Sequence, residues 1–121
     1  MINRSLAFAA TLALIGSAAY AQQPAEMSFR LTAGDRNPSA CIGADASMSR
    51  VQTVTIVGDM AVLKSNGGIN DKAKQASPGI YKTKWSAGGF TYDIEVNTTV
   101  SPKILTVAEA KLGCKWAGNA S

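Results

Sequence analysis

The stretch Ile80–Val96, IYKTKWSAGGFTYDIEV, decides the fold, because two alternating runs lie on either side of a turn signal. The runs Ile80–Trp85 and Phe90–Val96 are rich in aromatic and β-branched residues, and Ser86–Gly89 separates them. Alternation with a period of two, bounded by glycine and serine, is typical of a β-hairpin. The sequence therefore predicts two antiparallel strands here.

The register of this hairpin follows from setting Trp85 opposite Phe90, at the two ends of the loop. One face then pairs aromatic and β-branched residues, and the other face is polar. The predicted pairs are Trp85–Phe90, Thr83–Tyr92 and Tyr81–Ile94 on the first face, and Lys82–Asp93 and Lys84–Thr91 on the second. Opposite charges across a strand pair are favourable, so pattern, turn and charge all support a hairpin.

A second hairpin is predicted from Val51–Val57 and Met60–Lys64, which flank Gly58-Asp59. A glycine in the first position of a two-residue loop suits a type II′ turn. The resulting cross-strand pairs are Val57–Met60, Ile56–Ala61 and Val54–Leu63. The last two pairs make one apolar face.

Further strands are predicted at Met27–Leu31, at Ile69–Ala76 and from Ile104 onward. The last segment leaves two interpretations open. It is either one strand from Ile104 that runs on through Cys114 to Trp116, or it turns helical over Val107–Leu112, where the helix propensity is good. With six to eight strands, the fold class is all-β, either a small antiparallel β-barrel or a sandwich.

The N-terminal residues 1–21 have the features of a cleavable secretory signal peptide. Arg4 precedes the apolar run Leu6–Ile15, and Ala19–Ala21 offers small residues at the positions that a signal peptidase reads. A membrane anchor is the alternative, but a spanning helix needs about 20 apolar residues. We therefore expect a periplasmic or secreted protein, with a single small β domain at residues 22–121 and no transmembrane segment after cleavage.

The chain has two cysteines, Cys41 and Cys114. An even number of cysteines in an oxidising compartment indicates a disulfide. Closing a loop of about 74 residues stabilises a fold by roughly 4 kcal/mol in the chain-entropy model. Two free thiols or a redox pair are the alternatives, although a redox pair is usually spaced as Cys-x-x-Cys.

The chain contains no histidine, so the commonest general base and the commonest metal ligand are missing. Oxidised cysteines are neither nucleophiles nor zinc ligands. Most of the acids fall in predicted turns or on an outward strand face, namely Asp35, Asp45, Asp59, Asp71, Asp93 and Glu95. We therefore expect no enzyme, no metal and no cofactor. The remaining catalytic alternatives are a glycosidase-like carboxylate pair, a Ser-Lys pair or a tyrosine.

The net charge of +4 is too mild for a nucleic-acid-binding protein. Lysines occur in the pairs Lys72/Lys74 and Lys82/Lys84. They make either a soluble outer face that discourages edge-to-edge pairing or a basic stripe for an anionic partner.

The four aromatic residues of the first hairpin also allow two interpretations. They either fill the core of a small barrel or line a ligand cavity within it. These residues are Tyr81, Trp85, Phe90 and Tyr92.

The segment Ser77–Tyr81, SPGIY, followed by Trp85–Gly88, WSAG, resembles periplasmic inhibitors of C-type lysozyme. Members of that family are exported β-barrels with a disulfide, and they carry Ser-Gly-x-x-Tyr and Trp-Ser-Lys-Gly segments. Here the glycine is displaced, and Ala87 stands where the family has the turn lysine. The resemblance implies inhibition through a loop that enters the lysozyme cleft. The corresponding residues are Ser77, Gly79 and Tyr81, with Lys82 beside them.

The residues themselves favour a non-enzymatic binding module whose partner is an unidentified protein or small ligand. Lysozyme inhibition through the Ser77–Lys82 loop is the alternative that the resemblance adds. A structural or envelope-stress protein without a pocket is a third class.

Overall fold

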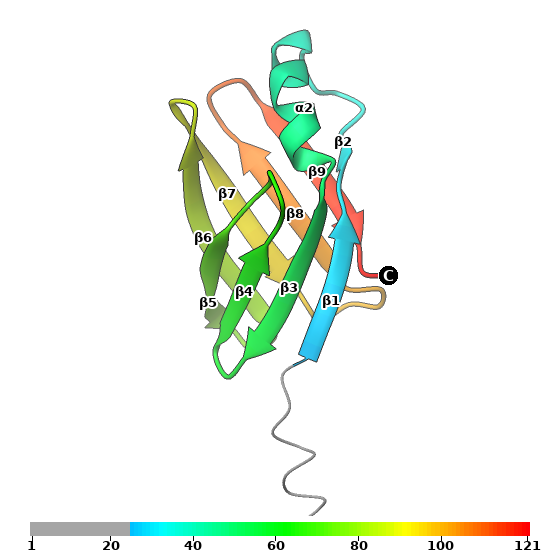
Figure 1. Cartoon of the computed structure of the whole chain (residues 1–121), viewed down its shortest axis with the longest axis vertical. Coiled ribbons are helices and arrows are strands. Elements are labelled where there is room, and N and C mark those ends of the chain that lie inside the picture. The colour runs from blue at the N-terminus through cyan, green and yellow to red at the C-terminus, as the bar shows by residue number, and fades with distance from the viewer. Residues whose placement is uncertain (1–24) are drawn as a thin grey trace, which may run out of the picture.

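Antiparallel strands dominate the computed structural model, which describes residues 25–121 (Figure 1). The predicted signal peptide lies outside these residues. The strands are β1 Ala25–Arg30, β2 Thr32–Ala33, β3 Val51–Val57, β4 Met60–Lys64, β5 Asp71–Ser77, β6 Ile80–Ala87, β7 Phe90–Asn97, β8 Ile104–Glu109 and β9 Cys114–Asn119. A 3-10 turn, η1 (Ser39–Cys41), and a short helix, α2 (Ile42–Met48), lie between β2 and β3.

All the strands belong to one nine-stranded sheet in the order β1-β3-β4-β5-β6-β7-β8-β9-β2. Only Leu31 separates β1, which pairs with β3, from β2, which pairs with β9. The chain therefore changes partner at Leu31 and brings the two ends of the sheet together. The all-β antiparallel prediction is confirmed, and the sheet is nearly closed and barrel-like. The expected number of six to eight strands is too low, because the described residues form nine.

The seam of this barrel-like sheet lies between β1–β2 and β9. Phe29 forms an isolated bridge with Ala120, and the Ser121 amide donates to the Ser28 carbonyl at 3.0 Å. At Gly118 the two backbones approach so closely that an added Cβ would collide with the Arg30 carbonyl. The seam therefore depends on the missing side chain of this glycine.

The β6–β7 hairpin is present, but its predicted register is wrong by two residues. Ala87 lies opposite Phe90, and Trp85 lies opposite Tyr92. The reason is the turn, because Gly88 and Gly89 have φ values of 60° and 81° and form the whole loop. Positive φ at both central residues is the requirement of a type I′ turn.

A shift of two residues leaves each side chain on its predicted face, because the side-chain period of a strand is two. The outer face still carries the charged pairs, with new partners. Lys82 lies 3.5 Å from Glu95, and Lys84 lies 2.7 Å from Asp93. The predicted pairs Lys82–Asp93 and Lys84–Thr91 are therefore corrected.

The second hairpin, β3–β4, has the predicted pairs Val57–Met60, Ile56–Ala61 and Val54–Leu63. Gly58 has a φ of 61°, as the first position of a type II′ turn requires. The strands expected at Met27–Leu31 and Ile69–Ala76 are β1 and β5, with shifted ends.

The late segment forms two strands, β8 and β9. The strand expected from Ile104 is present as β8, but its continuation to Trp116 and the helix over Val107–Leu112 are both wrong. Both carboxylate oxygens of Glu109 accept hydrogen bonds within the turn, from the amides of Lys111 at 2.6 Å and Leu112 at 2.7 Å. Gly113 then adopts a φ of 79°, which reverses the chain. A continuous strand or a helix cannot include this turn.

The core fills the inside of the sheet. Its largest fully buried side chains are Trp116, Phe29, Leu31, Met48, Leu63, Ile69, Ile94 and Leu105. Gln52 is equally buried, and neither polar atom of its side chain has a hydrogen-bond partner among the described residues. It packs beside Ser65 and Gly68 in the β4–β5 loop, and it is one of two buried polar side chains of the described residues, with Glu109.

Candidate functional site

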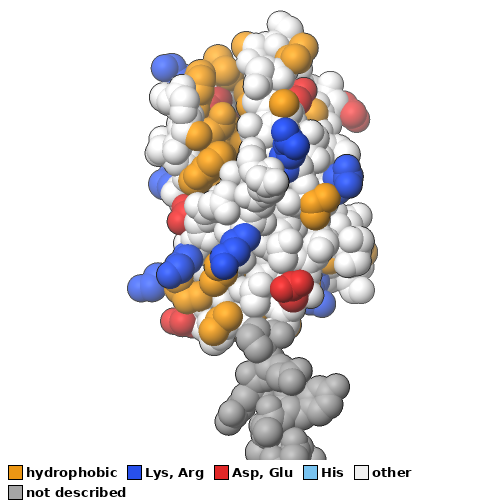
Figure 2. Space-filling view, viewed as in Figure 1, with side chains coloured by type: hydrophobic (Ala, Val, Ile, Leu, Met, Phe, Trp, Pro, Cys, Tyr) orange, Lys and Arg blue, Asp and Glu red, His pale blue; other side chains and the backbone are white. Residues whose placement is uncertain are grey.

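A cleft of about 330 Å³ lies at the end of the sheet that carries α2 and the β6–β7 turn. Figure 2 shows hydrophobic side chains gathered in a hollow at the upper left of the view, beside the position of α2 in Figure 1. The cleft has a wall from α2, a wall from the β6–β7 hairpin and a floor from β8 and β9. The sheet and α2 both contribute lining residues, so both are needed to form this cleft.

The α2 wall is built mainly from small residues, with the buried Met48 at its end. Gly43, Ala44 and Ser47 line the cleft, and they lie on one side of the helix because their spacing is three or four residues. Short side chains do not reach across to the hairpin, so space remains between the two walls. No helix is predicted here from the sequence.

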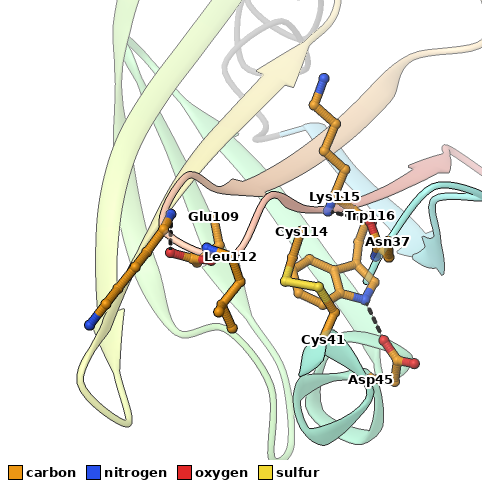
Figure 3. The surroundings of a disulfide bond; sticks show 9 residues. Asn37, Cys41, Asp45, Glu109, Leu112, Cys114, Lys115 and Trp116 are labelled. Atoms are coloured by element: carbon orange, nitrogen blue, oxygen red, sulfur yellow. Dashed lines mark hydrogen bonds between the residues drawn. A yellow bond between two sulfur atoms is a disulfide. The ribbon is translucent and has the colours of Figure 1, made fainter. Parts of the chain in front are cut away.

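The floor fixes α2 to β9 through covalent and polar contacts (Figure 3). The disulfide between Cys41 and Cys114 is present, which confirms that prediction. The Trp116 indole Nε1 donates to Asp45 Oδ1 at 2.8 Å. The prediction that Asp45 lies in a turn is wrong, because it lies within α2, which directs its carboxylate toward β9.

A second anchor lies beside the disulfide, where Asn37 pairs with the backbone of Lys115. The Asn37 side-chain amide donates to the Lys115 carbonyl, and its oxygen accepts from the Lys115 amide, both at 2.8 Å. This two-bond contact ties the segment before α2 to β9. The α2 wall is therefore held just before its first residue, through Asn37 and Cys41, and in its middle, through Asp45.

The hairpin wall is aromatic. Trp85, Phe90 and Tyr92 line the cleft, while Tyr81 is a core residue with an exposed fraction of 6%. The ring centroids of Trp85 and Tyr92 are 5.6 Å apart, and those of Tyr92 and Trp116 are 6.1 Å apart. The aromatic residues of the hairpin thus divide between the two predicted roles, core and cavity lining.

Glu109 is the acidic residue of the cleft. Its exposed fraction is 3%, and it forms no ion pair with any described residue. Burial raises the pKa of Tyr92, and the Glu109 charge raises it further. The Tyr92 hydroxyl is therefore protonated at neutral pH, and it ionises only at a higher pH than an ordinary tyrosine does.

The loop implied by the lysozyme-inhibitor resemblance lies at the opposite end of β6 from the cleft. Ser77 is exposed, and the Gly79 carbonyl accepts from the Thr98 amide at 2.8 Å and from its hydroxyl at 2.7 Å. Tyr81 points into the core, whereas Lys82 is on the outer face. The structure therefore brings Ser77 and Gly79 into one turn and separates Tyr81 from Lys82.

The four lysines of the predicted pairs are all exposed. Lys74 lies directly opposite Lys82, and Lys82 and Lys84 have acidic partners on β7. Figure 2 shows basic side chains at the lower left of the view, over the region of β4 and β5. Both interpretations of the lysines, a soluble face and a basic stripe, require this exposure.

Within residues 25–121 there is no group of three or more histidine, cysteine, aspartate or glutamate side chains that could hold a metal ion. No helix in that part of the chain is both long enough and apolar enough to cross a membrane.

The fold and the cleft together define a disulfide-bonded, barrel-like antiparallel domain with a helix-walled cleft at one end. Comparisons with protein-family models, with curated proteins and with solved structures found no match. The function is therefore inferred from the site itself.

Proposed function

We propose that this protein is a non-enzymatic binding module whose ligand occupies the cleft between α2 and the β6–β7 hairpin. The observation that carries the proposal is an open, aromatic-walled cleft of about 330 Å³ at the mouth of the sheet. Ligand sites typically have volumes of about 300–1,000 Å³, are mostly apolar and often lie in the mouths of barrels. The ligand is therefore a small molecule or a single side chain of a partner.

The walls of the cleft are set before a ligand arrives. α2 is fixed by the disulfide and by the Trp116–Asp45 hydrogen bond, and Trp85 packs on Tyr92 in the opposite wall. A site that is already ordered loses little conformational entropy on binding. This arrangement favours a binding protein over a structural protein without a pocket.

The chemistry of the cleft also favours binding over catalysis. The chain has no histidine, and both oxygens of Glu109 already accept backbone hydrogen bonds. A general base needs a pKa near the working pH and a free path to its substrate proton. We include a periplasmic or secreted location in the proposal, because a disulfide is typical of an oxidising compartment.

Filling the cleft is expected to abolish binding. In Ala44→Leu the larger side chain enters the cleft from α2, so the affinity for the neutral fluorescent probe N-phenyl-1-naphthylamine falls at least about 10-fold, on the scale of a few buried methylenes. The measurement is a fluorescence titration of the oxidised protein, with circular dichroism to verify folding. Ala46→Leu is the matched control, because Ala46 is exposed on the same helix and does not line the cleft. Equal probe affinity in Ala44→Leu and wild type would contradict the proposal.

Inhibition of C-type lysozyme through the Ser77–Lys82 loop is the second candidate. The observation in its favour is the pair of hydrogen bonds from Thr98 that holds the exposed turn at Gly79. A rigid loop enters an enzyme cleft at low entropic cost.

A turbidity assay of bacterial lysis tests this second candidate. We expect the protein to slow lysis at micromolar excess over lysozyme, Lys82→Glu to lose the effect, and Ala44→Leu to keep it, because Ala44 lies at the other end of the sheet. Unchanged lysis at that excess would eliminate the candidate without affecting the cleft.

A further inference from the structure

We infer that the cleft binds a small organic cation, with a substituted ammonium group enclosed by the aromatic wall and close to Glu109. This inference rests on the proposed function and specifies the ligand class of the same site. It depends on the charge of the cleft, on its aromatic rings and on the Lys111 ammonium that lies over one of these rings.

The charge of the cleft is opposite to that of the protein. The chain has a net charge of +4, yet Glu109 is the one charged side chain among the residues that line the cleft, all of which lie in the described part. A buried carboxylate is costly unless it is paired or well hydrogen-bonded. Two backbone amides stabilise Glu109, but no lysine or arginine of the described chain pairs with it. A cationic ligand would supply the missing charge.

The aromatic side chains of the hairpin wall are suited to the same ligand. Trp85, Phe90 and Tyr92 line one cleft. A cation over an aromatic face is attracted by the ring quadrupole, and cages of such rings recognise quaternary ammonium groups. Trp85 and Phe90 are partly exposed, so a ligand can reach their rings.

The chain itself provides a cation at this wall. The Lys111 ammonium lies 5.6 Å from the centroid of the Phe90 ring. Lys111 belongs to the β8–β9 turn that Glu109 organises, and it is not a lining residue itself, although the Phe90 ring beneath its ammonium is one. A bound cation would compete with this ammonium for the same ring and would be repelled by it.

An anionic or a neutral ligand fits the cleft less well. An anion would be desolvated beside the buried Glu109 carboxylate, with like charges in a medium of low dielectric constant. A neutral ligand would cover the Glu109 carboxylate without forming an ion pair with it. The cationic class is the one in which both the rings and the carboxylate contribute.

The test compares choline with 3,3-dimethyl-1-butanol, which has nearly the same shape and no charge. Both are titrated into the oxidised protein, and tryptophan fluorescence and NMR shifts are followed. We expect choline to bind about 10-fold more tightly, in the range of desolvated cation–π contacts. Trp85→Leu should weaken choline binding, and Glu109→Gln should weaken choline more than the neutral compound.

Lys111→Met provides a test that does not disturb the Glu109 turn. Removing the competing ammonium should tighten choline binding about two- to fivefold and leave the neutral compound unchanged. Lys115→Met is the matched control, because it removes the same charge from an exposed residue that does not line the cleft.

Each other result has a definite meaning. Equal affinity for the two compounds overturns the cation inference and leaves cleft binding intact. Failure of both compounds to bind, while N-phenyl-1-naphthylamine still binds in the cleft, also overturns only the inference. Failure of all three probes overturns both the inference and the proposed function.

Discussion

The double variant Cys41→Ala/Cys114→Ala is expected to lower the free energy of unfolding by about 4 kcal/mol. The disulfide joins residues separated by 73 positions, so it removes many conformations from the unfolded chain. Urea denaturation of the oxidised protein and of the variant, followed by tryptophan fluorescence, measures the difference. Reduced wild type is the matched control, because it should unfold at the same urea concentration as the variant.

In the same variant, probe binding should be lost at a lower urea concentration than the β-sheet structure. Without the disulfide, α2 keeps the Trp116–Asp45 bond and the Asn37–Lys115 contact, which are both non-covalent. We therefore expect weakened cleft binding at urea concentrations at which the far-ultraviolet circular dichroism is still native. A stability loss below about 1 kcal/mol would show that the cross-link hardly constrains the unfolded chain, contrary to the chain-entropy estimate.

The sequence was sufficient to predict the faces of both central hairpins, because period-two patterns and turn glycines are local signals. For β3–β4 the register was also right, since Gly58 determines a two-residue turn. For β6–β7 the predicted loop is Ser86–Gly89, but Gly88-Gly89 alone forms it. The error moved the ion pairs, but it did not move any side chain to the other face.

The candidate site was not predictable in the same way, because it depends on contacts between distant segments. α2 has seven residues and no side-chain cap at its N-terminus, so its local signals are weak. The alanine-rich run around it is the signal that could have indicated a helix. The sequence does indicate the aromatic residues that line the cleft. The cleft itself exists because α2 is held against β9, a contact between distant segments. Glu109 lines the cleft because of the β8–β9 turn, which the sequence does not predict.

Gly118→Ala is expected to open the seam of the sheet and to lower the free energy of unfolding by about 3 kcal/mol, at the upper end of typical overpacking costs. An alanine Cβ would collide with the Arg30 carbonyl and lie within 3.3 Å of Leu31 Cα, and both are backbone atoms that cannot rotate away. The strain falls where the chain changes partner from β3 to β9, so relief requires that one of these pairings weakens.

Urea denaturation gives the stability change, and amide hydrogen exchange shows where it arises. The amides of Ser121 and Gly34 should lose protection, because they donate across the seam to Ser28 and to Lys115. Gly43→Ala is the control, since an added Cβ there meets nothing within 4 Å and alanine favours a helix. If Gly118→Ala kept wild-type stability while Gly43→Ala behaved as expected, the close approach at the seam would not be required for closure. If Gly118→Ala lost stability without faster amide exchange at Ser121 and Gly34, the strain would be relieved elsewhere than at the seam between β1–β2 and β9.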